Sequence, residues 1–254
     1  MNASRGSCIR VGGLSFGVFA TRAPHASAAS AASPDSRYVL VHGIGTSHHY
    51  LSRLHRELAR SADVWSIDLP GFGSAPKPAS APDVGEMANA LGRVLEGVGG
   101  PPFVMIGHSM GAQWVTELAR LRPDLVRAVV LIGPVVDREH RSVLAQCRAL
   151  VVDALRETPS VNGLVLMAYL RCGPRYFLRQ ARYMVRYRLE ERIAEVSVPA
   201  LVVRGGRDVV AGARWSRLLR DRATRSGLVT FARHRHAVQH TAPREVAAAI
   251  REFA

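Results

Sequence analysis

One serine in this chain has neighbours that suit a nucleophile. Residues 107–111 read Gly-His-Ser-Met-Gly; they follow an apolar run at 103–106 that predicts a buried strand, and helical spacing begins at 112–120. A turn this tight leaves little room for a Cβ on either side of the serine, which explains the two glycines. It would also push the Oγ of Ser109 out above the sheet, at a helix N-terminus that favours negative charge. The pattern predicts covalent acyl transfer by Ser109, and a plain glycine-serine turn is the alternative.

A serine hydroxyl is a weak nucleophile at neutral pH and needs a histidine base held beside it. The chain has ten histidines. Three of them, His234, His236 and His240, lie between an apolar run at 228–231 and a helical run at 243–253. A loop in that place returns to the edge of a parallel sheet where its strands end. Spacing alone does not choose among these three residues.

The acid that orients such a base should also follow a strand. Asp208 comes after the apolar run 200–203 and two glycines, whose flexibility allows a turn that lifts the carboxylate above the sheet. Two alternatives stay open, since Asp208 could simply cap the next helix and Asp137 follows another apolar run. The order Ser109, Asp208, His236 along the chain is the order in which enzymes with this kind of serine turn carry their triads.

Acyl transfer also needs backbone N–H groups aimed at the oxygen that becomes negative. One should come from Met110, directly after the nucleophile. The other should come from the sequence His-Gly-Ile-Gly at 42–45, which follows an apolar run at 37–41, and Ile44 is the natural donor there. A simple glycine turn is the competing explanation for this segment.

The rest of the sequence supplies the elements that must position these groups. Apolar runs rich in β-forming residues alternate with amphipathic helical runs, which predicts a mostly parallel sheet covered by helices on both faces. The predicted strands are 37–41, 63–67, 103–106, 128–132, 200–203 and 228–231, and the predicted helices are 50–60, 84–95, 112–120, 215–222 and 243–253.

Residues 135–196 interrupt this alternation and contain no convincing strand. They read as helices at about 138–156, 160–170 and 175–193. We expect a helical cap that shapes a pocket and excludes water, dividing the core into 1–134 and 197–254. Extra helices packed on the side of the core are the alternative.

The N-terminal residues allow two interpretations. The apolar stretch 11–20 after two arginines loosely resembles a secretory signal. Glycines interrupt that stretch, however, and 8–11 and 14–21 read better as two strands around a Gly-Gly turn. Residues 22–36, rich in Ala, Ser and Pro, would then form a flexible surface connection.

The composition excludes several classes of protein. The 254 residues are 48% apolar and 21% charged, so the chain is neither disordered nor collagen-like. No apolar run reaches the roughly eighteen residues of a membrane-spanning helix. The three cysteines, Cys8, Cys147 and Cys172, suit neither a disulfide framework nor a paired zinc site. A reducing compartment, the cytoplasm, fits them best.

The net charge is +14, from 34 Lys plus Arg against 20 Asp plus Glu. A basic surface attracts nucleic acid, anionic lipid or acidic substrates where its charges cluster. Six arginines and no acidic residue lie within 171–188, and we interpret them as a solvated helix face, with a rim that attracts an anionic substrate as the alternative. The aromatic residues nearby indicate packing of the cap, and no nucleic-acid-binding motif accompanies them, so no nucleic-acid partner is expected.

Five motifs in this order resemble those of the α/β-hydrolases with a helical cap. They are His-Gly-Ile-Gly at 42–45, Asp-Leu-Pro-Gly-Phe-Gly-Ser at 68–74, the serine turn at 107–111, Val-Val-Arg-Gly-Gly-Arg-Asp at 202–208 and His-Ala-Val-Gln-His-Thr-Ala-Pro at 236–243. The resemblance covers about residues 11–253. It implies the α/β-hydrolase fold, with a helical cap insertion and an N-terminal β-hairpin.

The resemblance also selects among the histidines. His236 stands seven residues before Pro243, as the base of the family does, and Asp208 matches the position of its acid. The sequence departs mildly from the family at Arg235 and Val209, where Gly and Pro are common. The implied machinery is a Ser-His-Asp triad that needs no metal and no organic cofactor.

The substrate site implied by the resemblance lies beside the nucleophile, and we expect His42, Gly43, His108 and Trp114 to contribute to it. A serine nucleophile argues against the dehalogenases and epoxide hydrolases of this fold, which use Asp. Carbon–carbon hydrolases of the family often carry Asn where His108 stands, so we expect a small acyl substrate that is an ester, thioester or lactone. The alternatives are a carbon–carbon bond hydrolase of a ring-cleavage product and a non-catalytic small-molecule-binding protein.

Overall fold

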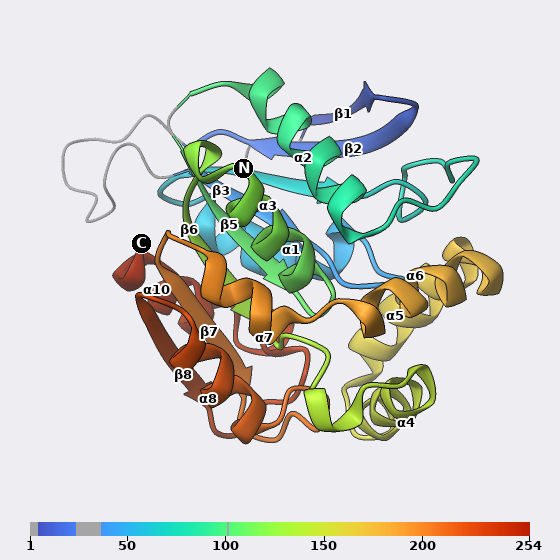
Figure 1. Ribbon diagram of the computed structural model, residues 1–254, viewed down its shortest axis with the longest axis vertical. Helices are drawn as coiled ribbons and strands as arrows, with labels where there is room; N and C mark the ends of the chain where they lie inside the picture. The colour runs from blue at the N-terminus through green and yellow to red at the C-terminus, as the bar shows by residue number, and fades with distance from the viewer. Residues whose placement is uncertain (1–4, 24–36, 101) are drawn as a thin grey trace.

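A computed structural model describes residues 5–23, 37–100 and 102–254 and contains one eight-stranded sheet (Figure 1). The strands are β1 (Arg5–Val11), β2 (Leu14–Thr21), β3 (Arg37–Val41), β4 (Asp63–Asp68), β5 (Phe103–His108), β6 (Val126–Ile132), β7 (Ala200–Gly205) and β8 (Ser226–Phe231). Their order across the sheet is β1-β2-β4-β3-β5-β6-β7-β8. All pairs from β4 to β8 are parallel, and only β1 and β2 run antiparallel to their neighbours. The mostly parallel sheet predicted from the sequence is confirmed.

The predicted N-terminal hairpin is also present. Val11 of β1 pairs with Leu14 of β2, and the two glycines between them both have positive φ, +55° and +79°. A β-carbon is strained in that region, which is why this turn takes glycine. The predicted flexible connection at 22–36 lies almost entirely outside the described residues.

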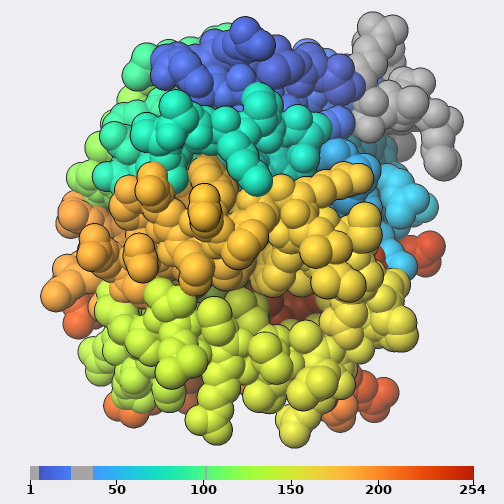
Figure 2. All heavy atoms as spheres, turned by 90° about the vertical axis from the view of Figure 1, so that its right-hand side faces the viewer, coloured from blue at the N-terminus to red at the C-terminus, as the bar shows by residue number. Residues whose placement is uncertain are grey.

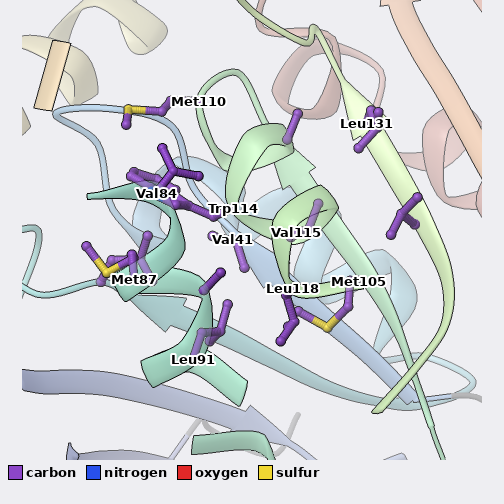
Figure 3. Packing of buried hydrophobic residues seen from close by; sticks show 14 of the residues in the cluster. Val41, Val84, Met87, Leu91, Met105, Met110, Trp114, Val115, Leu118 and Leu131 are labelled. Atoms are coloured by element: carbon purple, nitrogen blue, oxygen red, sulfur yellow. The ribbon is translucent and has the colours of Figure 1, made fainter. Parts of the chain in front are cut away.

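Helices cover both faces of the sheet. On one face lie α2 (Val84–Val98), α3 (Gly111–Leu121) and α8 (Ala213–Arg222), and on the other lie α1 (His48–Leu58) and α10 (Pro243–Phe253). Side chains alternate along each strand, so that Val39 of β3 enters the first core and Leu40 enters the second. Figure 3 shows the first core where α2 meets α3, with Leu91 and Leu118 among the contacting residues.

Local chemistry sets several helix boundaries. The side chain of Asp83 accepts a hydrogen bond from the N–H of Glu86, whose carboxylate accepts one from the N–H of Asp83, so α2 begins with a reciprocal cap. Helix α10 begins at Pro243, as predicted, because a proline in the first turn has no N–H to leave unpaired.

Only helices occur between β6 and β7 in the part of the chain that the structure describes. They are α4 (Val143–Ala154), α5 (Pro159–Cys172), α6 (Pro174–Arg186) and the single turn α7 (Leu189–Arg192), besides two short 3-10 turns (Arg138–His140 and Ile193–Glu195). The predicted helix at 138–156 starts later, because the side chain of Ser142 caps α4 through the N–H of Ala145. The predicted helix at 175–193 is interrupted after α6.

The outer surface of these helices is both apolar and basic. The six arginines of 171–188 are all exposed. Large apolar side chains on α4, in the turn after it, on α5 and on α6 are exposed as well: Leu144, Val151, Leu155, Leu166, Met167, Leu170 and Leu178. Among the described residues, no helix is long and apolar enough to cross a membrane.

Candidate active site

Ser109 stands in a strained turn between β5 and α3. Its φ is +55°, and it is the sole residue other than glycine with positive φ in the described ranges. A Cβ on Gly107 would lie 2.3 Å from the carbonyl oxygen of Gly111, and a Cβ on Gly111 would lie 2.4 Å from that of Val41. The backbone around the serine therefore admits only glycine on both sides, as the sequence pattern predicted. Strain of this kind is kept where a side chain must be held in one place.

His236 and Asp208 form a buried pair at the same edge of the sheet. Nδ1 of His236 lies 2.9 Å from Oδ2 of Asp208. The other carboxylate oxygen accepts hydrogen bonds from the N–H groups of Val210 (2.8 Å) and Ala211 (2.9 Å). Both oxygens of Asp208 are thus used, and its carboxylate is fixed relative to the imidazole.

Gly133, the residue after β6, packs closely against His236 and Asp208. A Cβ on Gly133, whose φ is +54°, would lie 2.9 Å from Nδ1 of His236 and 3.3 Å from Oδ2 of Asp208. The position therefore leaves no space for a side chain beside the histidine–carboxylate hydrogen bond.

The charges of the pair reinforce each other. Burial opposes ionisation of Asp208, but the charge of His236 and hydrogen bonds from its ring and two backbone N–H groups hold the pKa of the carboxyl below its usual value. Burial would lower the pKa of His236, yet the charge and hydrogen bond of Asp208 outweigh it and the pKa is raised. The carboxylate therefore stabilises the imidazolium form.

The second nitrogen of His236 is not used by the pair with Asp208. Nε2 is buried and has no hydrogen-bond partner, and Ser109 and His236 line the same cavity. No hydrogen bond joins the two side chains in this structure. Catalytic hydrogen bonds of this kind are often long without substrate and tighten when it binds.

The other candidates for base and acid have different partners. Nδ1 of His234 lies 2.9 Å from Oγ1 of Thr241, and His240 stacks on Tyr50. Asp137 accepts a hydrogen bond from the N–H of Glu139 and caps a short 3-10 turn. Of the three histidines left open by spacing, His236 is the one that contacts Asp208.

His108 contacts the loop that carries His236. Its Nε2 lies 3.2 Å from the carbonyl oxygen of His236, and the two ring centroids are 4.8 Å apart. Burial, assisted by the neighbouring His236, lowers the pKa of His108 to about 3. A neutral imidazole can donate from Nε2, so His108 holds the backbone of its neighbour without adding charge.

The loop after β3 passes beside the serine. A Cβ on Gly43 would lie 2.9 Å from Cβ of Ser109, so this backbone touches the proposed nucleophile. Nδ1 of His42 lies 2.7 Å from the carbonyl oxygen of Gly43, and Nε2 accepts from the N–H of Leu69 at 3.2 Å. His42 is fully buried and fastens this loop to the next one.

A cavity of about 230 Å³ opens beside Ser109. The core contributes Gly43, Ile44, Thr46, Tyr50, His108, Ser109 and His236, and α4, the turn that follows it, α5 and α6 contribute Cys147, Leu150, Val151, Asp153, Ala154, Glu157, Val161, Asn162, Val165, Tyr169 and Phe177. Figure 2 shows a hollow between the yellow-green and yellow segments of the chain, in which red atoms of its C-terminal part are visible.

Two of the four residues expected around the substrate lie elsewhere. Gly43 and His108 line the cavity, but His42 and Trp114 do not. Trp114 is fully buried in the core between α2 and α3, 6.2 Å from the ring of Phe72, and Figure 3 shows it beside Val84. Proximity to the serine in sequence did not give the direction of its side chain.

The chain is similar in sequence and in structure to several known proteins. A sequence model described as the alpha/beta hydrolase fold matches residues 39–151. A pimeloyl-[acyl-carrier protein] methyl ester esterase of Neisseria meningitidis is 26% identical over 87% of this chain and 78% of its own length. An (E)-2-((N-methylformamido)methylene)succinate hydrolase of Acinetobacter baylyi is 23% identical over 82% and 86%. The enol-lactonase of Burkholderia xenovorans superposes with a TM-score of 0.80 at 16% identity, over 97% of this chain and 99% of that one. The chain has the α/β-hydrolase fold. It is a hydrolase.

The cavity of this hydrolase is also lined by two acidic residues, Asp153 and Glu157, which the sequence analysis did not single out. Asp153, near the end of α4, is buried beside His236, and Oε1 of Glu157 accepts a hydrogen bond from the N–H of Ala237 at 3.2 Å. They stand four residues apart in an otherwise largely apolar stretch, which is the spacing of one helix face. That spacing was the one sequence feature that could have indicated that these two carboxylates lie close together.

Proposed function

We propose that this α/β-hydrolase is a serine hydrolase that cleaves a carboxylic ester, thioester or lactone through an acyl-enzyme. Ser109 is the nucleophile, His236 the base and Asp208 the acid that orients it. The observation that carries the proposal is the Asp208–His236 pair, whose unpartnered Nε2 shares a cavity with the strained Ser109.

In the first half of the reaction, Oγ of Ser109 attacks the acyl carbon while Nε2 of His236 takes its proton. The carboxylate of Asp208 holds the imidazole through Nδ1 and stabilises the imidazolium. The alcohol or thiol then leaves with the proton from Nε2, and the acyl group stays on Ser109.

The negative oxygen of the tetrahedral intermediate needs donors already in place. Ile44 and Met110 flank the serine from two loops, and neither backbone N–H has an acceptor within the described part of the chain. Each such donor contributes about 3 kcal/mol in comparable sites. In the second half, His236 activates a water molecule that releases the acyl group in the same way.

We propose that residues 135–196 act as the cap and that 1–134 and 197–254 are the two parts of the hydrolase core. Helices α4, α5 and α6 provide more than half of the residues that line the cavity. Walls of this kind exclude water from the acyl-enzyme until it is to be hydrolysed.

The lining favours an ester, thioester or lactone of a small acyl group that carries no negative charge. It is mainly apolar, and neither Arg nor Lys is among its described residues. The relative from Neisseria meningitidis is named for a methyl ester and the structural neighbour from Burkholderia xenovorans for an enol lactone, and both reactions suit this machinery.

A fluorophosphonate probe tests the nucleophile. The wild-type protein should be labelled on Ser109, as mapped by peptide mass spectrometry, and should hydrolyse p-nitrophenyl butyrate. Ser109→Ala should lose both properties. A wild-type protein that folds but takes no label and hydrolyses no ester would overturn the proposal.

A further inference from the structure

The cavity contains a buried carboxylate that the hydrolytic mechanism does not use. Asp153 is 5% exposed, lines the cavity together with Ser109 and His236, and its Oδ1 has no hydrogen-bond partner. An uncompensated polar atom inside a protein is costly, and its retention calls for an explanation.

The charge around Asp153 is mostly of the same sign. The groups that act on it are the carboxylates of Asp208 and Glu157, and the imidazole and backbone N–H of His236. The phenol of Tyr50 also faces it from α1. Neither Arg nor Lys is among the described residues that line the cavity, and the six arginines of 171–188 are exposed.

This surplus of negative charge changes the pKa of Asp153. Burial, with help from Asp208 and Glu157, raises the pKa of Asp153 to about 6, while His236 opposes the shift. A cation close to Oδ1 would relieve both the burial and the repulsion. A second carboxylate would add to them.

We propose that Asp153 is a specificity-determining residue, which selects substrates that carry an ammonium group, protonated or quaternary, and disfavours substrates that carry a carboxylate. The inference rests on the proposed ester-cleaving function and adds the chemical class of the substrate. The ammonium group pairs with Oδ1 of Asp153, and Glu157, fixed on the N–H of Ala237, adds negative potential from the turn after α4. The outer arginines then play no part in recognition inside the cavity.

The test compares matched esters. On the acyl side these are p-nitrophenyl heptanoate, its 6-aminohexanoate analogue with ammonium in place of methyl, and mono-p-nitrophenyl adipate. On the alcohol side they are butyrylcholine and its uncharged analogue 3,3-dimethylbutyl butyrate. The measured quantity is the ratio of kcat/KM for the charged ester to that for its neutral partner, in each series.

We call this quantity the cation ratio for the ammonium esters and the adipate ratio for the carboxylate ester. For the wild-type protein at pH 8 we expect the cation ratio to exceed one in at least one series and the adipate ratio to fall below one. Asp153→Asn keeps the shape of the side chain and should lower that cation ratio by at least about tenfold, because a buried charge pair is lost. Glu157→Gln should lower it less. Asp137→Asn, outside the cavity, is the matched control and should leave the ratios unchanged.

A second measurement needs no variant. The cation ratio of the wild-type protein should fall from pH 7.5 to pH 5.5, because Asp153 becomes protonated near pH 6. Protonation of His236 affects both esters of a pair and cancels in the ratio.

The inference is overturned if the wild-type protein shows no cation preference in either series, if it prefers adipate, or if Asp153→Asn keeps the wild-type ratios. In each of these cases the neutral esters are still hydrolysed, so the proposed function stands. Loss of neutral-ester turnover and of fluorophosphonate labelling in the wild-type protein would instead contradict the function itself.

Discussion

The sheet core and the helices between β6 and β7 are built in different ways. Nearly every residue of the central strands β3, β5 and β7 is buried, and the glycines at their ends are required by contacts of under 3 Å. Helix α4 buries only Gln146 and Asp153, and α5 only Val161 and Cys172. The contrast indicates that packing fixes the proposed reacting groups on the core, while few buried contacts hold α4 and α5. Under the proposed function, the reaction type therefore depends on the core and the choice of substrate on the helical segment.

The largest expected effect is on the core side of this comparison. Asp208→Asn should keep the hydrogen bonds from Val210 and Ala211 but offer an N–H to His236, which forces the wrong tautomer. By analogy with triads elsewhere, kcat on p-nitrophenyl acetate should fall about 10⁴-fold. Circular dichroism checks that the fold is intact. A loss of less than tenfold would remove Asp208 from the triad.

A leucine pair tests the difference in packing directly. Leu54→Ala in α1, at 0% exposure, should lower the free energy of unfolding by about 2–5 kcal/mol. Leu155→Ala, just after α4 and 80% exposed, should change it by no more than about 0.5 kcal/mol. Urea denaturation measures both. Equal losses would mean that the helical segment is packed as tightly as the core.

Substitution of one glycine in each region tests how packing affects turnover. Gly133→Ala would place a Cβ against Nδ1 of His236 in a backbone with positive φ, and kcat should fall about 10²-fold, as for a misplacement near 1 Å. Gly163→Ala in α5, which has open space around it, is the control and should not reduce turnover. Similar rates for the two variants would show that the region beside His236 can relax.

The smallest expected effect is a change in the pKa of His236, to which Asp208 of the core and Asp153 of α4 both contribute. Because His236, as the proposed base, must be neutral and its pKa is raised above 6.5, kcat/KM for a neutral ester should rise with pH through a midpoint above 6.5. The charge of Asp153 adds to the larger effect of Asp208. Asp153→Asn should therefore move the midpoint slightly down, and Asp137→Asn should not move it. An upward shift would contradict this electrostatic account.

The core could be predicted from sequence because its signals are local. Alternating apolar runs gave the strands, and the spacing of residues 107–111 gave the serine turn, since a strained turn between strand and helix admits few residue types. The choice of His236 as the base came from the resemblance to the α/β-hydrolases, and the structure brings Asp208 and His236 together. These signals need no knowledge of which elements later pack against one another.

The cavity could not be predicted in the same way, because its lining depends on tertiary packing. Trp114 follows the serine closely, yet its side chain lies on the face of α3 that meets α2. Asp153 resembles a solvated acid in sequence, and its burial appears only when α4 is placed over the core. The interruption after α6 and the late start of α4 are likewise set by caps and contacts within the segment.

One contact between the two regions has a dynamic consequence. The carboxylate of Glu157 holds the backbone N–H of Ala237, the residue next to His236. An outward movement of the helices would break this hydrogen bond and leave the histidine loop held by Asp208 and His108 on the core side. The position of the helical segment and that of the proposed base are therefore mechanically linked through Glu157.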